Sequence, residues 1–328
     1  MRWTQWALLA LLSSITSSAS ANEPKPEPAV AKPVHPPEPS GPRLVINNLF
    51  AVRYNPLGLE DQLRIGVQQR LYKSESTVLK DNFFFGGLAP RVNPAFIKFG
   101  PALEIQPLSI FNLRVGAEWV GFFGSFGFLQ SFRSPREEYS DTVLLDGREA
   151  GRMYSTYGGH AMIEPMVQFK LGPVAVRNKV AIEYWKMKVT EGTRLFYDVT
   201  LDTLISSDGW VISNDLDVLY MHDFKSWSGT FEGARLTAGV RYSMVNPLYR
   251  ERDFPKGDTG EGVKNAHHRV GPLVAFTFFD RGFTTFNRPT ALLIANWYAD
   301  HRYRTGRDVS QAIPYLVLAF AFQSNLLP

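Results

Sequence analysis

The sequence predicts an all-β fold, a transmembrane antiparallel β-barrel of about twelve strands. One observation is a two-residue alternation of apolar and polar side chains over long segments such as 111–119, 163–171 and 174–186. Strands of soluble sandwiches are commonly about 5–6 residues long, whereas these segments are long enough to cross a bilayer. The other observation is that beyond residue 20 no stretch approaches the ~18 consecutive apolar residues of a membrane helix. Any span must therefore be made of strands.

The residues before the alternating region divide into two parts. Residues 1–21 are predicted to be a secretory signal peptide, with Arg2 before an apolar core and Ala19-Ser20-Ala21 as its cleavage site. Residues 22–42 hold eight prolines among charged and small residues, which predicts an extended periplasmic tether. The tether is either a passive spacer or a docking segment for a periplasmic partner or the cell wall. The barrel is then expected over residues 43–328.

The predicted strands of the first half each place apolar residues on alternate positions. In chain order, with part of each apolar face, they are 44–54 (Ile46, Phe50, Val52), 63–71 (Leu63, Ile65, Val67), 97–106 (Ile97, Phe99, Leu103), 111–119 (Leu113, Val115, Trp119), 163–171 (Ile163, Val167, Phe169) and 174–186 (Val176, Val180, Ile182). Asn55-Pro56-Leu57-Gly58 and Gly172-Pro173 are predicted turns. The alternation is weaker at 80–86 and 120–132, where a strand and a loop remain alternatives.

The second half continues the same pattern. Its predicted strands are 195–202 (Leu195, Tyr197, Val199), 215–220 (Leu216, Val218, Tyr220), 235–243 (Leu236, Val240, Tyr242), 269–280, 289–300 and 313–323. Long polar loops are expected at 133–152 and 246–268, and barrels of this class place long loops outside the cell. Both chain ends of such barrels normally lie in the periplasm, which requires an even strand number. About twelve strands are therefore predicted, with about ten and about fourteen as alternatives.

The last predicted strand carries a recognisable motif. Within Tyr315-Leu316-Val317-Leu318-Ala319-Phe320-Ala321-Phe322, residues Tyr315, Phe320 and Phe322 are the aromatic positions. This segment resembles the C-terminal insertion signal of bacterial outer-membrane β-barrels. The sequence departs from that signal because Val317 stands where glycine is common, and because residues 323–328 follow the final aromatic residue.

The resemblance implies a location and an insertion route. It implies residence in the bacterial outer membrane after cleavage near Ala21, in contact with its lipid, and insertion by the barrel-assembly machinery. It matches the architecture and no single porin, transporter or enzyme family, so the cargo stays open.

Composition excludes several other classes of protein. The chain has no cysteine, which excludes disulfides, thiolate zinc sites and iron–sulfur ligation. The net charge of +4 is small for 328 residues and no dense Lys/Arg run occurs, so nucleic acid is not an expected partner. No cofactor is predicted.

The polar face of the strands defines the predicted lumen. Its charged residues have both signs, with basic residues on early strands and an acidic group at 198–217. They are Arg64, Arg70, Lys98, Glu104, Arg114, Glu118, Glu164, Lys170, Arg177, Lys179, Glu183, Asp198, Asp202, Asp215, Asp217, Arg235 and Arg241. Opposite charges on neighbouring strands either pair into a closed network or line a narrow wet pore, and both remain open.

No catalytic or metal site is predicted. The chain has no His-x-Ser triplet, and His222 has the opposite strand parity to Asp215 and Asp217. Lumen acids paired with arginines are therefore preferred to catalytic acids. The adjacent pairs His267-His268 and Asp300-His301 point apart on a strand, which argues against a metal site.

These observations predict a narrow porin-like channel for small polar solutes. The alternative is a structural or docking subunit of an envelope-spanning assembly for motility, adhesion or polysaccharide export. An outer-membrane hydrolase is a distant third.

Overall fold

A computed structural model describes residues 41–123 and 129–327 of the chain. The predicted signal peptide and nearly all of the predicted tether, residues 1–40, lie outside the described residues. So do residues 124–128 of the Phe-rich run.

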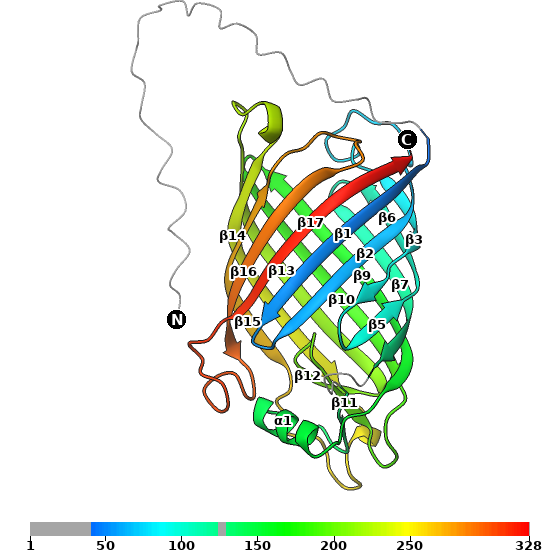
Figure 1. Ribbon diagram of the computed structural model, residues 1–328, viewed down its shortest axis with the longest axis vertical. Helices are drawn as coiled ribbons and strands as arrows, with labels where there is room; N and C mark the ends of the chain where they lie inside the picture. The colour runs from blue at the N-terminus through cyan, green and yellow to red at the C-terminus, as the bar shows by residue number, and fades with distance from the viewer. Residues whose placement is uncertain (1–40, 124–128, 328) are drawn as a thin grey trace, which may run out of the picture. The chain divides into compact units, whose positions relative to one another are not determined.

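The described chain forms a closed antiparallel barrel of 12 strands, as predicted (Figure 1). The sheet elements are β1 (Arg43–Tyr54), β2 (Gly58–Gln69), β3 (Phe83–Leu88), β4 (Arg91–Val92), β5 (Phe96–Phe99), β6 (Pro101–Leu108), β7 (Phe111–Phe122), β9 (Thr156–Leu171), β10 (Val174–Met187), β13 (Asp208–Asp223), β14 (Arg235–Leu248), β15 (His267–Thr277), β16 (Asn287–Asp300) and β17 (Tyr315–Leu327). β3 and β4 together make one barrel strand, as do β5 and β6. β17 pairs with β1 and closes the sheet.

Side chains alternate between the outer wall and the interior, and β17 shows this clearly. Leu318 and Phe320 point outward and are 61% and 40% exposed, whereas Tyr315 and Val317 point inward and are each 8% exposed. Closure pairs the edge strands with each other, so the backbone groups of the wall are satisfied within the sheet. An apolar outer face around a closed ladder is the arrangement that a bilayer tolerates.

Residues 195–202 do not form a barrel strand, and that prediction was wrong. β11 (Leu195–Asp198) and β12 (Thr203–Ser206) pair with β8 (Ser131–Phe132) in a separate three-stranded sheet. All side chains of β11 and β12 are buried, on both faces, so the segment packs inside protein and has no lipid-facing side. The weakly patterned residues at 80–86 supply the missing strand, because β3 and β4 belong to the barrel.

The barrel has two different ends. We call the end with the connections 123–155, 188–207, 249–266 and 301–314 the loop end, and the end with Arg43 and Leu327 the terminus end. The predicted loops at 133–152 and 246–268 both belong to the loop end, although β14 extends to Leu248 before the second begins. Which end faces the cell exterior stays a prediction.

The first long loop contains a helix that the sequence analysis missed. α1 (Asp141–Glu149) begins after Ser140, whose hydroxyl accepts a 3.3 Å hydrogen bond from the Val143 N–H. Two single-turn 3-10 helices, η2 (Gly229–Phe231) and η3 (Glu251–Asp253), complete the connections. Among the described residues, no helix has the length and apolar character needed to cross a membrane.

Candidate functional site

A belt of charges with alternating sign runs around the inner wall. It consists of Arg64 on β2, Glu104 on β6, Arg114 on β7, Glu164 on β9, Arg177 and Lys179 on β10, Asp215 and Asp217 on β13, and Arg241 on β14. Each lies at an inward-facing position, because all have the parity of buried neighbours on their strands. We call this set the charge belt.

Ion pairs connect neighbours along the first part of the belt. Arg64 pairs with Glu104, and Arg114 pairs with Glu164. The Lys179 ammonium lies 3.7 Å from Oε1 of Glu164. Arg114 and Lys179 each lie beside an acid on a neighbouring strand, which is the cross-strand arrangement that stabilises a sheet. Arg64 instead reaches Glu104 across β3, which lies between β2 and β6.

Asp217 anchors the other part of the belt. Its Oδ1 accepts a 2.7 Å hydrogen bond from Arg241 Nε, and its Oδ2 accepts a 3.0 Å hydrogen bond from Arg177 Nε. Next to it, Asp215 lies 3.8 Å from both Lys179 Nζ and Arg241 Nη1. The predicted pairing of these two lumen acids with an arginine on β14 is thus present.

A second cluster lies between the belt and the loop end. Glu118 receives Arg91 through a bidentate contact, with Nη2 at 2.9 Å from Oε1 and 3.0 Å from Oε2. His160 lies between two acids, with Nδ1 2.9 Å from Glu118 and Nε2 2.9 Å from Glu183. Each imidazole nitrogen therefore lies within hydrogen-bond distance of one carboxylate. We call these residues the His160 cluster.

Exposure differs sharply between the two charged layers. The side chains of Arg177 and Lys179 are 40% and 41% exposed, whereas those of Glu118 and His160 are each 1% exposed. Arg177 lies near the β9–β10 turn at the terminus end. Water therefore reaches these two belt residues at the terminus end, whereas Glu118 and His160 are shielded from it. The other members of the His160 cluster, Arg91 and Glu183, are 18% and 13% exposed.

An apolar plug accounts for the burial of Glu118 and His160. Inward-facing residues of the wall pack against the small sheet and its flanking loop in one buried cluster. Its members include Phe96, Val120, Phe122, Trp185 and Val211 from the wall, with Leu129, Phe196 and Ile205 from the loop segments. The segments 129–155 and 188–207 thus fold into the mouth of the barrel and pack against its inner wall.

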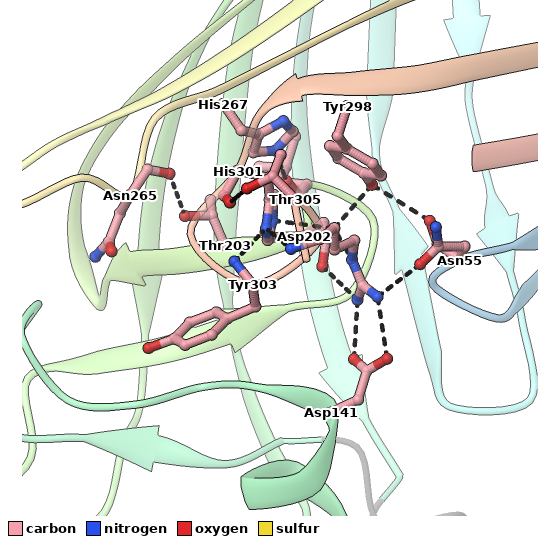
Figure 2. Close-up of polar contacts among 12 residues, drawn as sticks. Asn55, Asp141, Asp202, Thr203, Asn265, His267, Tyr298, His301, Tyr303 and Thr305 are labelled. Atoms are coloured by element: carbon pink, nitrogen blue, oxygen red, sulfur yellow. Dashed lines mark hydrogen bonds and ion pairs between the residues drawn. The ribbon is translucent and has the colours of Figure 1, made fainter. Parts of the chain in front are cut away.

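At the loop end, a buried ion-pair cluster joins the loops to one another (Figure 2). Arg304 donates to Oδ1 of Asp202 at 2.9 Å, to both oxygens of Asp141 at 2.9 and 3.0 Å, and to Asn55 Oδ1 at 2.7 Å. The hydroxyl of Tyr298 donates to Oδ2 of Asp202 at 2.8 Å. The guanidinium therefore links α1, the 199–202 turn, the β1–β2 turn and the 301–314 loop. We call this set the cap cluster.

Electrostatics keep Asp202 ionised in this setting. Burial alone would raise the pKa of its carboxyl, but the charges of Arg304 and His301, with their hydrogen bonds, hold that pKa well below its usual range. The same pairing raises the pKa of Arg304 against the effect of burial. A folded pKa below the unfolded one gives stability that is present above the unfolded pKa and is lost as the pH falls through the folded value.

A surface contact between two loops gives a pH prediction. Arg136 Nε donates to Asp258 at 2.7 Å, and this bond, with one from the Gly260 N–H, lowers the pKa of Asp258 to about 2. Since the unfolded value is about 3.9, the contact should hold above pH ~4 and be lost as the pH falls through ~2. Hydrogen exchange should show protection of the Gly260 amide failing near that pH, and at a higher pH in Arg136→Ala. Protection independent of pH over this range would contradict the assignment.

The predicted lumen residues do not all lie in the lumen. Arg64, Lys98, Arg114, Glu118, Glu164, Arg177, Lys179, Glu183, Asp215, Asp217, Arg235 and Arg241 occupy inward-facing strand positions. Arg235 lies at the terminus end, where it pairs with Asp223. Lys170, the penultimate residue of β9, is also exposed at the terminus end.

Three of the predicted positions need correction. Arg70 lies beyond β2, where its guanidinium donates to the backbone carbonyls of Tyr72 and Lys80. Asp198 and Asp202 belong to the small sheet and the turn after it, because the segment 195–202 packs into the mouth instead of forming the wall. Asp202 is therefore part of the cap cluster.

Sequence reasoning also missed several members of these clusters. His160, Arg91 and Arg304 were not among the predicted residues. His160 does share the parity of Glu164 along β9, which is a signal that the alternation contains. Arg304 follows β16 in a loop, where no periodicity applies. No group of three or more His, Asp or Glu residues within 41–123 and 129–327 is arranged to hold a metal ion.

Comparisons with known proteins give similarities to solved structures only. No protein-family model matches the chain, and no curated protein matches it. Among solved structures, the NanC porin is similar at 9% identity and a TM-score of 0.34, over 86% of this chain and 100% of that chain. OmpT, an outer membrane protein of Vibrio cholerae, is similar at 6% identity and 0.31, over 86% and 98%. A variant of the TodX monoaromatic hydrocarbon channel is similar at 8% identity and 0.34, over 88% and 91%.

These similarities are to the outer-membrane β-barrel fold, which this chain shares. At such identities and TM-scores they carry no argument about what the chain transports or binds.

Proposed function

We propose that this chain is a narrow channel of the bacterial outer membrane for small polar solutes, with a mouth that the folded loops close. The observation that supports it most is the charge belt, which water reaches from the terminus end. The belt places acids and bases on successive strands of the lumen wall, and the field of such fixed charges orients dipolar solutes and selects among ions. A solute that passes the belt meets the largely buried His160 cluster and the plug, so transport requires the loops to move.

Charge reversal at Arg177 tests the role of the belt. Arg177 is well suited because its side chain is 40% exposed and because Asp217 keeps Arg241 as a partner. In Arg177→Glu, we expect the cation-over-anion permeability ratio to rise roughly two- to tenfold. Reversal potentials in a salt gradient across a planar bilayer would measure this ratio.

The matched control is Arg288→Glu, which makes the same charge change at the second residue of β16, where the arginine is 58% exposed and pairs with Asp280. Its ratio should stay near that of the wild type. Equal ratios for wild type and Arg177→Glu would remove the belt from the ion path.

A closed structural or docking barrel is the second candidate, and the burial of the plug and the cap cluster favours it. In that case the tether at 22–42 would carry the interaction. Deleting residues 23–42 separates the two functions, because a channel should conduct unaltered whereas a docking subunit should lose its partner in a pull-down. A deletion that changes neither property would contradict the docking function.

A further inference from the structure

A pocket distinct from the charged lumen lies at the loop end, between α1 and the tight turns after β1 and β4. Its volume is about 590 Å³, within the usual range of small-molecule sites. The walls are mainly apolar, with Val52, Leu57, Leu59, Leu144, Leu145 and Met153 among them. Neither the charge belt nor the cap cluster explains why such a pocket exists.

The pocket continues the outer wall of the barrel. Val52 of β1 and Leu59 of β2 point outward and are 40% and 38% exposed. α1 lines the pocket with Asp141, Leu144, Leu145 and Arg148, whose i, i+3, i+4, i+7 spacing places them on one face of the helix. Because outward-facing side chains of β1 and β2 form part of the lining, an apolar molecule can enter the pocket from the membrane side.

One buried cation in the lining has an unmet hydrogen-bond donor. Arg53 is 6% exposed, and its Nη2 has no hydrogen-bond partner among the described residues. The nearest carboxylate oxygen, on Glu60, is 3.9 Å away, and Nη1 makes only a 3.5 Å contact with the Thr200 carbonyl. Buried guanidinium nitrogens are normally satisfied, so this nitrogen points to an acceptor oxygen supplied by a ligand.

The charges of the lining favour an anionic acceptor. Arg53 and Arg148 both line the pocket, and its acidic lining residue, Asp141, is already held by Arg304. A carboxylate matches the guanidinium geometry and its charge. We propose that the pocket binds a single-chain fatty carboxylate, with the chain among the apolar side chains and the carboxylate against Arg53.

The position of Arg53 separates this ligand from a membrane phospholipid. Arg53 points inward and is buried, whereas a phospholipid that inserts an acyl chain keeps its headgroup at the interface. The buried donor would then face a terminal methyl group and stay unsatisfied. A free fatty acid can enter head first and satisfy it.

Photo-crosslinking tests the assignment. The full chain, folded in phosphatidylcholine vesicles, would be illuminated with palmitic acid that carries a mid-chain diazirine, and labelled residues would be mapped by mass spectrometry. We expect label in 52–59 and 141–153, displaced by excess palmitate and much less by methyl palmitate. Label spread over the outer wall without saturation would overturn the site. Equal displacement by the methyl ester would overturn the role of Arg53, and equal saturable labelling by a diazirine phospholipid would identify the occupant as membrane lipid.

A substitution at an exposed position keeps the test independent of folding. Leu145 is 56% exposed, so Leu145→Glu should fold while placing a carboxylate in the apolar path. We expect saturable labelling to fall by at least about tenfold. The control Leu171→Glu makes the same change at an 81% exposed leucine at the terminus end and should label as the wild type does. Unchanged labelling in Leu145→Glu, with heat-modifiable migration showing a folded barrel, would contradict the proposal.

Discussion

Replacing Arg304 by alanine is expected to release the loop cap while leaving the barrel wall intact. Arg304 and Asp202 have side chains that are only 3% and 1% exposed, so the substitution leaves a buried carboxylate without its main partner. Breaking such a pair costs about 3–5 kcal/mol, because the remaining charge is not compensated. The cost falls on the state in which the loops are packed into the mouth, and the population of released loops should rise by a factor of about one hundred or more.

Limited proteolysis of the connections at 188–207 and 301–314 would measure this release. Cleavage there should accelerate strongly in Arg304→Ala, with the heat-modifiable migration of the folded barrel unchanged. Arg307→Ala is the matched control, since Arg307 is an exposed arginine of the same loop. If Arg304→Ala resists protease as well as Arg307→Ala does, the cap cluster does not hold the loops.

Replacing Glu118 by alanine is expected to produce the largest loss of stability within the wall. Glu118 is the shared acceptor of Arg91 and His160, and all three are largely buried. Its removal leaves two donors facing each other without an acid between them, which should cost about 3–5 kcal/mol. Urea unfolding of the refolded barrel, followed by tryptophan fluorescence, would measure the change in unfolding free energy.

The control for Glu118→Ala is Glu191→Ala, at an exposed loop position. Glu118→Gln should fall between the two, because its amide oxygen still accepts one hydrogen bond while the charge is lost. A Glu118→Ala barrel as stable as the Glu191→Ala barrel would show that the His160 cluster contributes nothing to the closed interior.

Much of the fold could be predicted from the sequence, because side-chain direction in a strand has a strict period of two. This period gave the outward face of β17 and the inward face of β13, with Asp217 buried and Val218 49% exposed. The same period misled at 195–202, because alternation describes a strand and does not say which sheet it joins. Phe196 is an apolar residue on the side that also carries Asp198, Thr200 and Asp202, and this is the signal that the segment packs inside protein.

The sequence predicted many of the residues that face the lumen, but it did not predict which of them contact each other. Parity placed Arg177 and Asp217 on the inner wall, but their contact depends on the register of β10 against β13. The sequence pattern could not predict the cap cluster. Its residues Asn55, Asp141, Asp202 and Arg304 lie in four connections between barrel strands, where the two-residue period of a strand does not apply. Register and loop packing are set by contacts far apart in the chain, and local patterns do not contain them.

Single-channel recording of the wild-type chain beside Arg304→Ala, each folded into a planar bilayer, tests the central claim most directly. The claim is that the charged lumen conducts and that the loops close it. We expect the wild type to show rare openings, and Arg304→Ala to show discrete steps that occur about a hundredfold more often. A silent Arg304→Ala barrel that has folded and released its loops would contradict a channel and favour a closed structural barrel. Equal conduction by both proteins would show that the loops do not close the mouth.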